Sequence, residues 1–320
     1  MRKIYFRADA GANIGYGHFV RTLALADMLN DNFDCTFFTQ TPTNYQRTEV
    51  AKVCKLVDLP SDDSKFDLFL NYLTGEEIVV LDNYFFTTDY QRQIKIRGCK
   101  LVCIDDIHDK HYVADVVINH GVVNSFDFDT ESYTRLCLGF DWLLLRKPFI
   151  ELIEKENYKA RTNKVVFAFG ASDMYNLTDY VANILNENNI QSIGIIGDGF
   201  KHRTKKYKNV RFFKNISDRD VADLFSLSEY AILPASSMCL EAISCGTKLL
   251  TGYFVDNQKE FARYMTNNGY AYDLGNMSLV SFENKLREVL FQIENSNISI
   301  TPLIFPKGTQ DRFINLFHAL

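Results

Sequence analysis

A single histidine stands in a glycine-rich stretch near the start of the chain, "GANIGYGHFVR". Gly15 and Gly17 precede His18, and a helical pattern over residues 18–30 follows. Glycines let the backbone turn sharply and approach a ligand closely. The positive end of the helix dipole disfavours an imidazolium, so we predict that His18 is a neutral base that can take a proton from water or a hydroxyl. A histidine that only packs or caps the loop is the alternative.

The glycines of this loop do not follow a known phosphate-binding pattern. Their spacing is G-x-x-x-G-x-G, which matches neither the dinucleotide fingerprint nor the Walker A loop. Arg21 lies three residues after His18, on about the same helix face. From the residues alone, Arg21 could hold a carboxylate or face solvent. We expect Arg21, with Gly15 and Gly17, to belong to the substrate-binding residues.

A second stretch, "PASSMCLEAISCG", has a layout that suits a nucleotide. A strand ends in small residues, and Ser236 and Ser237 lead into a helix start. Their hydroxyls and the N–H groups that follow could bind phosphate oxygens, and Glu241 could accept hydrogen bonds from a ribose diol. The alternatives are an ordinary serine N-cap and a favourable charge near a helix start.

Two further loops follow strands and carry polar groups. "FGASDMYN" places Asp173 and Asn176 after the strand at 165–169, and "FVDNQ" places Asn257 and Gln258 after another strand. Ligands bind at the carboxyl ends of strands in open α/β sheets, so we expect these side chains to belong to a binding site.

No metal site is expected. The pair of carboxylates that comes closest to a metal-binding pattern is Asp105 and Asp106, with His108 and His111 close by in the sequence. We interpret this stretch as a polar strand end that supports the glycine loop. The seven cysteines lack a CxxC spacing and suit reduced, buried thiols of a cytoplasmic protein.

The elements that must position these residues alternate between short apolar strands and helices. Continuous apolar runs such as "IVVL" and "LVCI" are typical of strands covered on both faces. The pattern predicts parallel α/β layers. A charged stretch near residues 145–163 interrupts it, and we interpret this stretch as an interdomain linker. We therefore expect two Rossmann-like domains, 1–150 and 151–320, facing across a cleft.

Composition narrows the possible partners. The chain has 320 residues, 47% of them hydrophobic, and a net charge of −5. We expect no nucleic-acid partner, because the balance is acidic and no basic run or stripe is expected. No secretory signal and no apolar run long enough to span a bilayer are apparent, so stable membrane association is not expected.

Together these stretches resemble a known family. Over nearly the whole chain, the sequence is similar to the UDP-sugar hydrolases of pseudaminic acid biosynthesis, which have the GT-B architecture. The resemblance rests on the order and spacing of "IGYGHFVRTLALA", "LDNYF", "IDD", "LGFDWLLLRKPF", "FGASDMYN", "PASSMCLEAISCG" and "DNQKEFARYM".

The resemblance implies an activity and roles for individual residues. The family cleaves UDP-2,4-diacetamido-2,4,6-trideoxy-β-L-altropyranose at the anomeric carbon with inversion, without a metal or cofactor. His18 would be the general base and Tyr84 would line the site. Ser236, Ser237 and Glu241 would hold the diphosphate and ribose, and Asn257 would approach the sugar or the water. We expect a monomer. The alternatives are an inverting GT-B glycosyltransferase and a non-catalytic nucleotide-sugar-binding protein.

Overall fold

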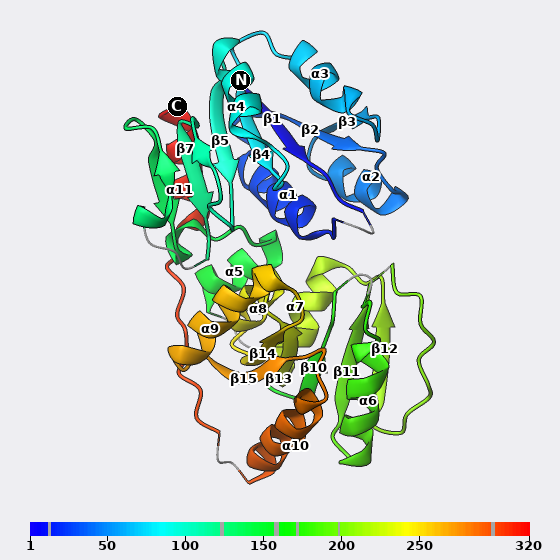
Figure 1. Ribbon diagram of the computed structural model, residues 1–320. Helices are drawn as coiled ribbons and strands as arrows, with labels where there is room; N and C mark the ends of the chain where they lie inside the picture. Colours follow the sequence, from blue (N-terminus) through cyan, green and yellow to red (C-terminus); the bar gives the residue numbers. More distant parts are fainter. Residues whose placement is uncertain (12–13, 122–124, 157–159, 171–172, 198, 296–297) are drawn as a thin grey trace. The chain divides into compact units, whose positions relative to one another are not determined.

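The computed structural model describes residues 1–320 except 12–13, 122–124, 157–159, 171–172, 198 and 296–297. The chain forms two compact units. Unit 1 comprises Met1–Lys147 together with Pro306–Leu320, and unit 2 comprises Pro148–Phe305. Each unit is a parallel α/β sandwich (Figure 1), which confirms the expected fold class.

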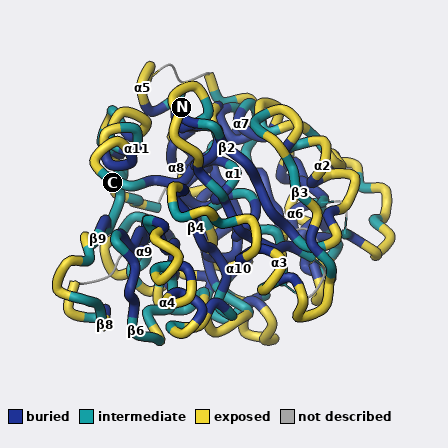
Figure 2. Tube along the Cα trace, turned by 90° about the horizontal axis from the view of Figure 1, so that it is seen from above, coloured by how far each residue is buried: buried dark blue, intermediate teal, exposed yellow. Residues whose placement is uncertain are grey.

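The sheet of unit 1, as far as the structure describes it, has seven parallel strands in the order β3-β2-β1-β4-β5-β7-β9. Strand β4 is buried throughout and apolar up to its last residue, and four of the six residues of β1 are buried. The inner strands are largely dark blue in Figure 2, which fits a sheet covered on both faces. The bounds are β1 (Lys3–Ala8), β2 (Asp34–Gln40), β3 (Lys55–Leu59), β4 (Ile78–Asp82), β5 (Lys100–Ile104), β7 (Val116–Asn119) and β9 (Arg135–Leu138).

Helices cover both faces of this sheet. Helices α3 (Ser64–Asn71) and α4 (Thr88–Ile96) bury Phe69, Tyr90 and Ile94 in one apolar cluster with the strands. Helix α1 (Gly17–Leu29) packs against α11 (Thr309–His318). The remaining elements are α2 (Asn44–Ala51), the paired strands β6 (His111–Tyr112) and β8 (Asp129–Thr130), and the short helices η1 (Ser125–Asp127) and η2 (Phe140–Trp142).

Unit 2 repeats the same design. Its described residues form six parallel strands in the order β12-β11-β10-β13-β14-β15. Helices α6 and α10 share one apolar cluster with the sheet. The strands are β10 (Asn163–Phe167), β11 (Ser192–Ile196), β12 (Val210–Lys214), β13 (Ser228–Pro234), β14 (Lys248–Tyr253) and β15 (Ala271–Asn276). The helices are α5 (Lys147–Lys155), α6 (Leu177–Glu187), α7 (Asp218–Ser226), α8 (Ser237–Ser244), the short η3 (Asp256–Gln258), α9 (Lys259–Asn267) and α10 (Ser281–Glu294).

Each sheet has one place where the direction of strand addition reverses. In unit 1 it lies between β1 and β4, and in unit 2 between β10 and β13. The connections leave these neighbouring strands toward opposite faces, which opens a crevice at their carboxyl ends where α/β proteins bind ligands. His18 follows β1, and Ser236 follows β13, so the two predicted sites coincide with the two reversal points.

The structure corrects three expectations about the chain's organisation. The last fifteen residues belong to unit 1, although we expected them in the second domain, because Phe317 of α11 is fully buried there and lies 6.2 Å from the ring of Phe33. The expected linker contains helix α5, whose apolar face buries Phe149 and Ile153. The elements β3, α3, β15 and α10 had no counterpart in the sequence interpretation.

Replacing Phe317 with alanine tests the place of α11. The substitution should lower the free energy of unfolding of unit 1 by about 3–5 kcal/mol, because it empties a fully buried aromatic site. The single tryptophan, Trp142, reports on this unit, since its ring lies 5.4 Å from Phe313 of α11. Fluorescence during urea unfolding should show an earlier midpoint.

The exposed Phe291 of α10 in unit 2 provides the matched control, and Phe291→Ala should leave the tryptophan transition unchanged. A Phe317→Ala protein with the wild-type midpoint would contradict the assignment of α11 to unit 1.

Candidate active site

The central feature of unit 1 is a buried pair formed by His18 and Asp82. His18 lies in the first turn of α1, and Asp82 is the last residue of β4. The imidazole Nδ1 lies 2.7 Å from Asp82 Oδ1. A carboxylate only accepts hydrogen bonds, so Nδ1–H donates to Asp82 and Nε2 is the nitrogen able to take a proton. The pair has the base-and-orienter arrangement of a general base.

Arg21 binds the same carboxylate. The sequence left open whether Arg21 holds a carboxylate or faces solvent. Its guanidinium donates to Asp82 through Nε and Nη2, both at 2.6 Å, and through Nη1 to Asp106. Thr22 donates its hydroxyl to Asp82 Oδ2 at 2.8 Å. Arg21 is buried, so it holds carboxylates of its own unit and does not face solvent.

Charge explains why this cluster is stable inside the unit. Burial alone would raise the pKa of Asp82, but the charges of Arg21 and His18 and their hydrogen bonds hold that pKa well below its usual range. Burial likewise opposes the charge of Arg21, yet Asp106 and Asp82 raise the pKa of Arg21 well above its ordinary value. One guanidinium therefore holds two carboxylates beside His18.

The motif "LDNYF" supplies three neighbouring side chains with different contacts. Asp82 orients His18. Asn83 accepts from the backbone N–H of Asp9 at 2.7 Å and donates to the Asp9 carbonyl at 3.3 Å, which fixes the start of the glycine loop against β4. Tyr84 donates its hydroxyl to Asp106 at 3.0 Å, and its ring meets the His18 ring edge-on with centroids 4.6 Å apart.

The glycine loop has open space above it. Gly15 has φ of +80°, a conformation that favours glycine, whereas Gly17 does not require it. A Cβ on either residue would meet no described heavy atom within 4 Å. Tyr16, the N-cap of α1, makes no side-chain cap bond, and the first turn carries no acidic residue. The loop can therefore admit a ligand beside His18.

The Asp105–Asp106 stretch serves the unit's own structure. Asp106 pairs with Arg21, as described above. Asp105 accepts from the backbone N–H groups of Ile107 and His108, and burial raises the pKa of its carboxyl group. Across the described part of the chain, no group of three or more His, Cys, Asp and Glu side chains is arranged to hold a metal ion.

In unit 2, Ser236, Ser237 and Glu241 surround the start of α8. Ser236 is the N-cap but its hydroxyl makes no cap bond, and it donates instead to the carbonyl of Pro234 at 3.1 Å. Ser237 begins the helix, and Glu241 is buried one turn later. Ser236 is therefore not an ordinary side-chain N-cap. In the first turn of α8, the backbone N–H of Cys239 donates to the Ser236 carbonyl at 2.9 Å.

Two other predicted binding residues have clear structural contacts. Asp173 is buried, and its carboxylate accepts from the backbone N–H groups of Leu177 and Thr178 at 2.9 and 2.8 Å, which caps α6. Gln258 accepts from the backbone N–H of Phe254 at 3.1 Å and closes the turn after β14. Their roles toward a substrate stay predictions. Asn257 is exposed in the same turn. Residues 171–172, within "FGASDMYN", lie outside the described residues.

Sequence reasoning missed the two carboxylates that organise unit 1. Asp82 stood in a quoted motif, immediately after four apolar residues of a buried strand. A lone carboxylate that ends a buried strand needs a partner, and this signal could have identified it. Asp106 was considered for a metal and not as the partner of Arg21.

Comparison with known proteins gives the fold class. The structure is similar to the crystal structure of Acinetobacter baumannii MurG, with a TM-score of 0.63 and 12% sequence identity. The match covers the whole of both chains. It matches Anabaena HepE in complex with UDP-glucose with a TM-score of 0.62 and 11% identity, over 99% of this chain and 100% of that one. The protein therefore has the GT-B fold, with two parallel Rossmann-like sheets.

One curated sequence narrows the resemblance further. The chain is 24% identical over 283 residues to the UDP-2,4-diacetamido-2,4,6-trideoxy-β-L-altropyranose hydrolase of Campylobacter jejuni, covering 84% of this chain and 97% of that protein. No protein-family profile matches the chain. Within the described residues, no helix combines the length and apolar character needed to cross a membrane.

A second buried histidine of unit 1 makes the folding stability depend on pH. His120 accepts from the backbone N–H of Leu144 at 3.1 Å, and burial, together with the charge of Arg21, lowers the pKa of His120 to about 4. Below pH ~6.5 the unfolded chain binds a proton that the native chain does not bind. Stability should therefore fall as the pH falls, by about 2 kcal/mol between pH 7 and pH 5.

His120→Asn keeps an acceptor for Leu144 and should flatten this pH dependence in urea unfolding. His111→Gln is the control. The hydrogen bonds that His111 donates to Asp129 and Glu131 raise the pKa of His111, so its removal should leave the acid-side loss of stability in place. Equal pH profiles for wild type and His120→Asn would refute the assignment.

Proposed function

We propose that the chain is a metal-independent, inverting nucleotide-sugar hydrolase. It cleaves the anomeric C–O bond of UDP-2,4-diacetamido-2,4,6-trideoxy-β-L-altropyranose or a related UDP-deoxyaminosugar and releases UDP and free sugar for nonulosonic acid synthesis. The observation that carries the proposal is the His18–Asp82 pair at the reversal point of unit 1, beside a glycine loop with open space. The similarity to the Campylobacter jejuni hydrolase supports the substrate class.

In this proposal, unit 1 supplies the base. His18 Nε2 accepts a proton from water as the water attacks the anomeric carbon from the face opposite the UDP, which inverts the configuration. Asp82 is a positioning residue that holds the Nδ1–H tautomer and stabilises the imidazolium that forms. Tyr84 restricts the ring through its edge contact and lines the site.

Unit 2 holds the nucleotide in this proposal. The leaving diphosphate gains negative charge as the C–O bond breaks. The first turn of α8 and the hydroxyl of Ser237 can stabilise that charge as hydrogen-bond donors. The hydroxyl of Ser236 joins them when it exchanges its bond to the Pro234 carbonyl for one to the diphosphate. Glu241 accepts from the ribose hydroxyls, and Asn257 approaches the sugar or the water. HepE, a structural neighbour with the same fold, was crystallised with UDP-glucose.

His18→Ala should lower kcat by about 10²–10⁴-fold and change KM by less than about threefold, because the base acts mainly in the transition state. UDP release from the donor sugar measures turnover, and proton NMR of the fresh product identifies the anomer. His111→Gln, which alters a histidine on the β6–β8 pair, is the matched control and should keep the wild-type rate.

Three outcomes separate the proposal from its rivals. Release of UDP by His18→Ala at the wild-type rate would refute the role of His18. Product formed only when an acceptor is added would indicate a glycosyltransferase of the same fold. Nucleotide-sugar binding without turnover in the wild-type protein would indicate a binding protein.

Glu241→Gln should weaken UDP binding by about tenfold or more, because hydrogen bonds to a charged acceptor contribute about 1.5–3 kcal/mol. Calorimetric titration with UDP measures this directly, without any turnover. Glu283→Gln, on the outer side of α10, is the control for the change in charge. Unchanged UDP affinity in Glu241→Gln would remove Glu241 from the nucleotide site.

A further inference from the structure

The loop between β11 and β12 carries an unusual concentration of positive charge. Unit 2 contains 17 Lys and Arg against 18 Asp and Glu in its sequence, yet seven of those cations lie between positions 201 and 214, where no acidic residue occurs. Five of them fall within "KHRTKKYK", residues 201–208, which we call the basic loop. The expectation that the chain has no basic run is therefore wrong at this place.

The basic loop is held along α6 at several points. His202 Nε2 lies 3.0 Å from the carbonyl of Asp173, before the start of α6. Tyr207 donates to Asp179 at 2.7 Å, and the backbone N–H of Lys208 donates to Asn186 at 3.1 Å near the end of the helix. Figure 1 shows the yellow-green loop beside α6. The loop is therefore fixed by contacts at both of its ends.

Most of its charges have no partner in the described part of the unit. Lys205 lies 3.7 Å from Asp179. Lys201, Arg203, Lys206 and Lys208 are exposed and form no ion pair with a described residue. By contrast, many exposed cations elsewhere in unit 2 pair with a carboxylate, as Arg287 does with Glu187 and Glu283. Like charges held together without counterions favour an anionic ligand.

The two ends of the basic loop differ in position. Lys201 and Arg203 flank His202, which is bound to the segment that follows β10 at the carboxyl edge of the sheet. Strand β10 lies next to β13, whose carboxyl end leads to Ser236 and Ser237. Lys208 lies toward the opposite end of α6, which is about 16 Å long. Lys206 lies in the chain between Lys208 and Lys205, whose backbone N–H donates to Asp179 in the first turn of the helix.

We propose that Lys201 and Arg203 bind the phosphates of the nucleotide at the carboxyl edge of unit 2, and that this pair selects nucleoside diphosphates over monophosphates. The proposal rests on the proposed function, since it assigns further residues to the same nucleotide. An overall charge of −5 repels such a ligand, and a fixed local cluster of cations overcomes that repulsion.

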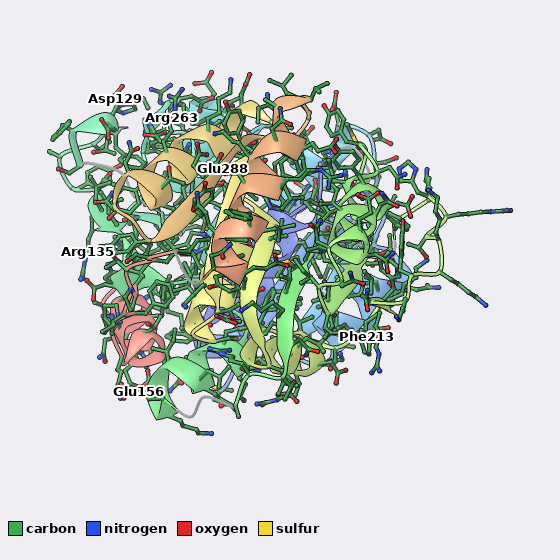
Figure 3. All side chains as sticks on the ribbon, turned by 90° about the horizontal axis from the view of Figure 1, so that it is seen from below. Asp129, Arg135, Glu156, Phe213, Arg263 and Glu288 are labelled. Carbon is green, nitrogen blue, oxygen red and sulfur yellow. The ribbon has the colours of Figure 1, made fainter. Side chains whose placement is uncertain are left out.

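An extended anionic partner would use the basic loop differently. A membrane surface or a nucleic acid would contact both ends of the loop about equally, since its charges continue over the length of α6. The edge strand β12 continues the basic stretch with Arg211 and Lys214 and exposes Phe213 (Figure 3). Comparing the two ends of the loop therefore separates a nucleotide from an extended partner.

The experiment compares two double variants of equal charge change. The near-end variant, Lys201→Ser with Arg203→Ser, removes the two charges at the carboxyl edge. The far-end variant, Lys206→Ser with Lys208→Ser, removes two charges from the other part of the basic loop. Calorimetry with UDP, UMP and uridine at about 50 and about 300 mM salt measures affinity and screening. The near-end variant should weaken UDP binding about tenfold at low salt, UMP binding less, and uridine binding not at all. The far-end variant should stay within about twofold of wild type.

Each other result overturns the proposal in a distinct way. Equal losses in both variants would indicate a diffuse field or an extended partner. Equal losses for UDP and uridine would place the near end away from the phosphates, and wild-type affinity in the near-end variant would remove it from the site. If the wild-type protein does not bind UDP, the proposed function fails together with this proposal.

Discussion

The buried carboxylate of Asp82 is the interaction on which unit 1 depends. It ends a fully apolar strand, and its two oxygens accept from His18, Arg21 and Thr22 of one helix. A charge at this depth is stable only because these donors compensate for lost hydration. The same contacts set the rotation of α1 relative to β4 and the orientation of the imidazole. Stability and proposed catalysis therefore depend on one side chain.

In both units the candidate site residues lie at the point where the direction of strand addition reverses. The two sets of residues differ in kind. In unit 1 the proposed base belongs to a side-chain cluster, in which one guanidinium holds two carboxylates beside a histidine. In unit 2 the proposed phosphate site is the start of a helix that carries two serine hydroxyls. The repeated topology gives each unit a strand-end crevice, and the proposal assigns the base to one crevice and the phosphates to the other.

The sequence predicted the repeated strand-and-helix order and the loops after β1 and β13, because continuous apolar runs and glycine-rich or serine-rich strand ends are local signals. It did not predict that Arg21 pairs with Asp106, since these residues are 85 positions apart and meet only through the order of β1, β4 and β5. The place of α11 was missed for the same reason. The sequence also did not indicate that the carboxylate of Asp173 caps α6, and the role of Asp173 toward a ligand stays a prediction.

The central claim is that a water molecule activated by His18 attacks the anomeric carbon. Hydrolysis of the UDP-sugar in water enriched in oxygen-18, followed by mass spectrometry of both products, tests it most directly. The account predicts that the heavy oxygen enters the free sugar at C1 and that UDP carries none. Heavy oxygen in the terminal phosphate of UDP would show cleavage of the P–O bond and would contradict the account.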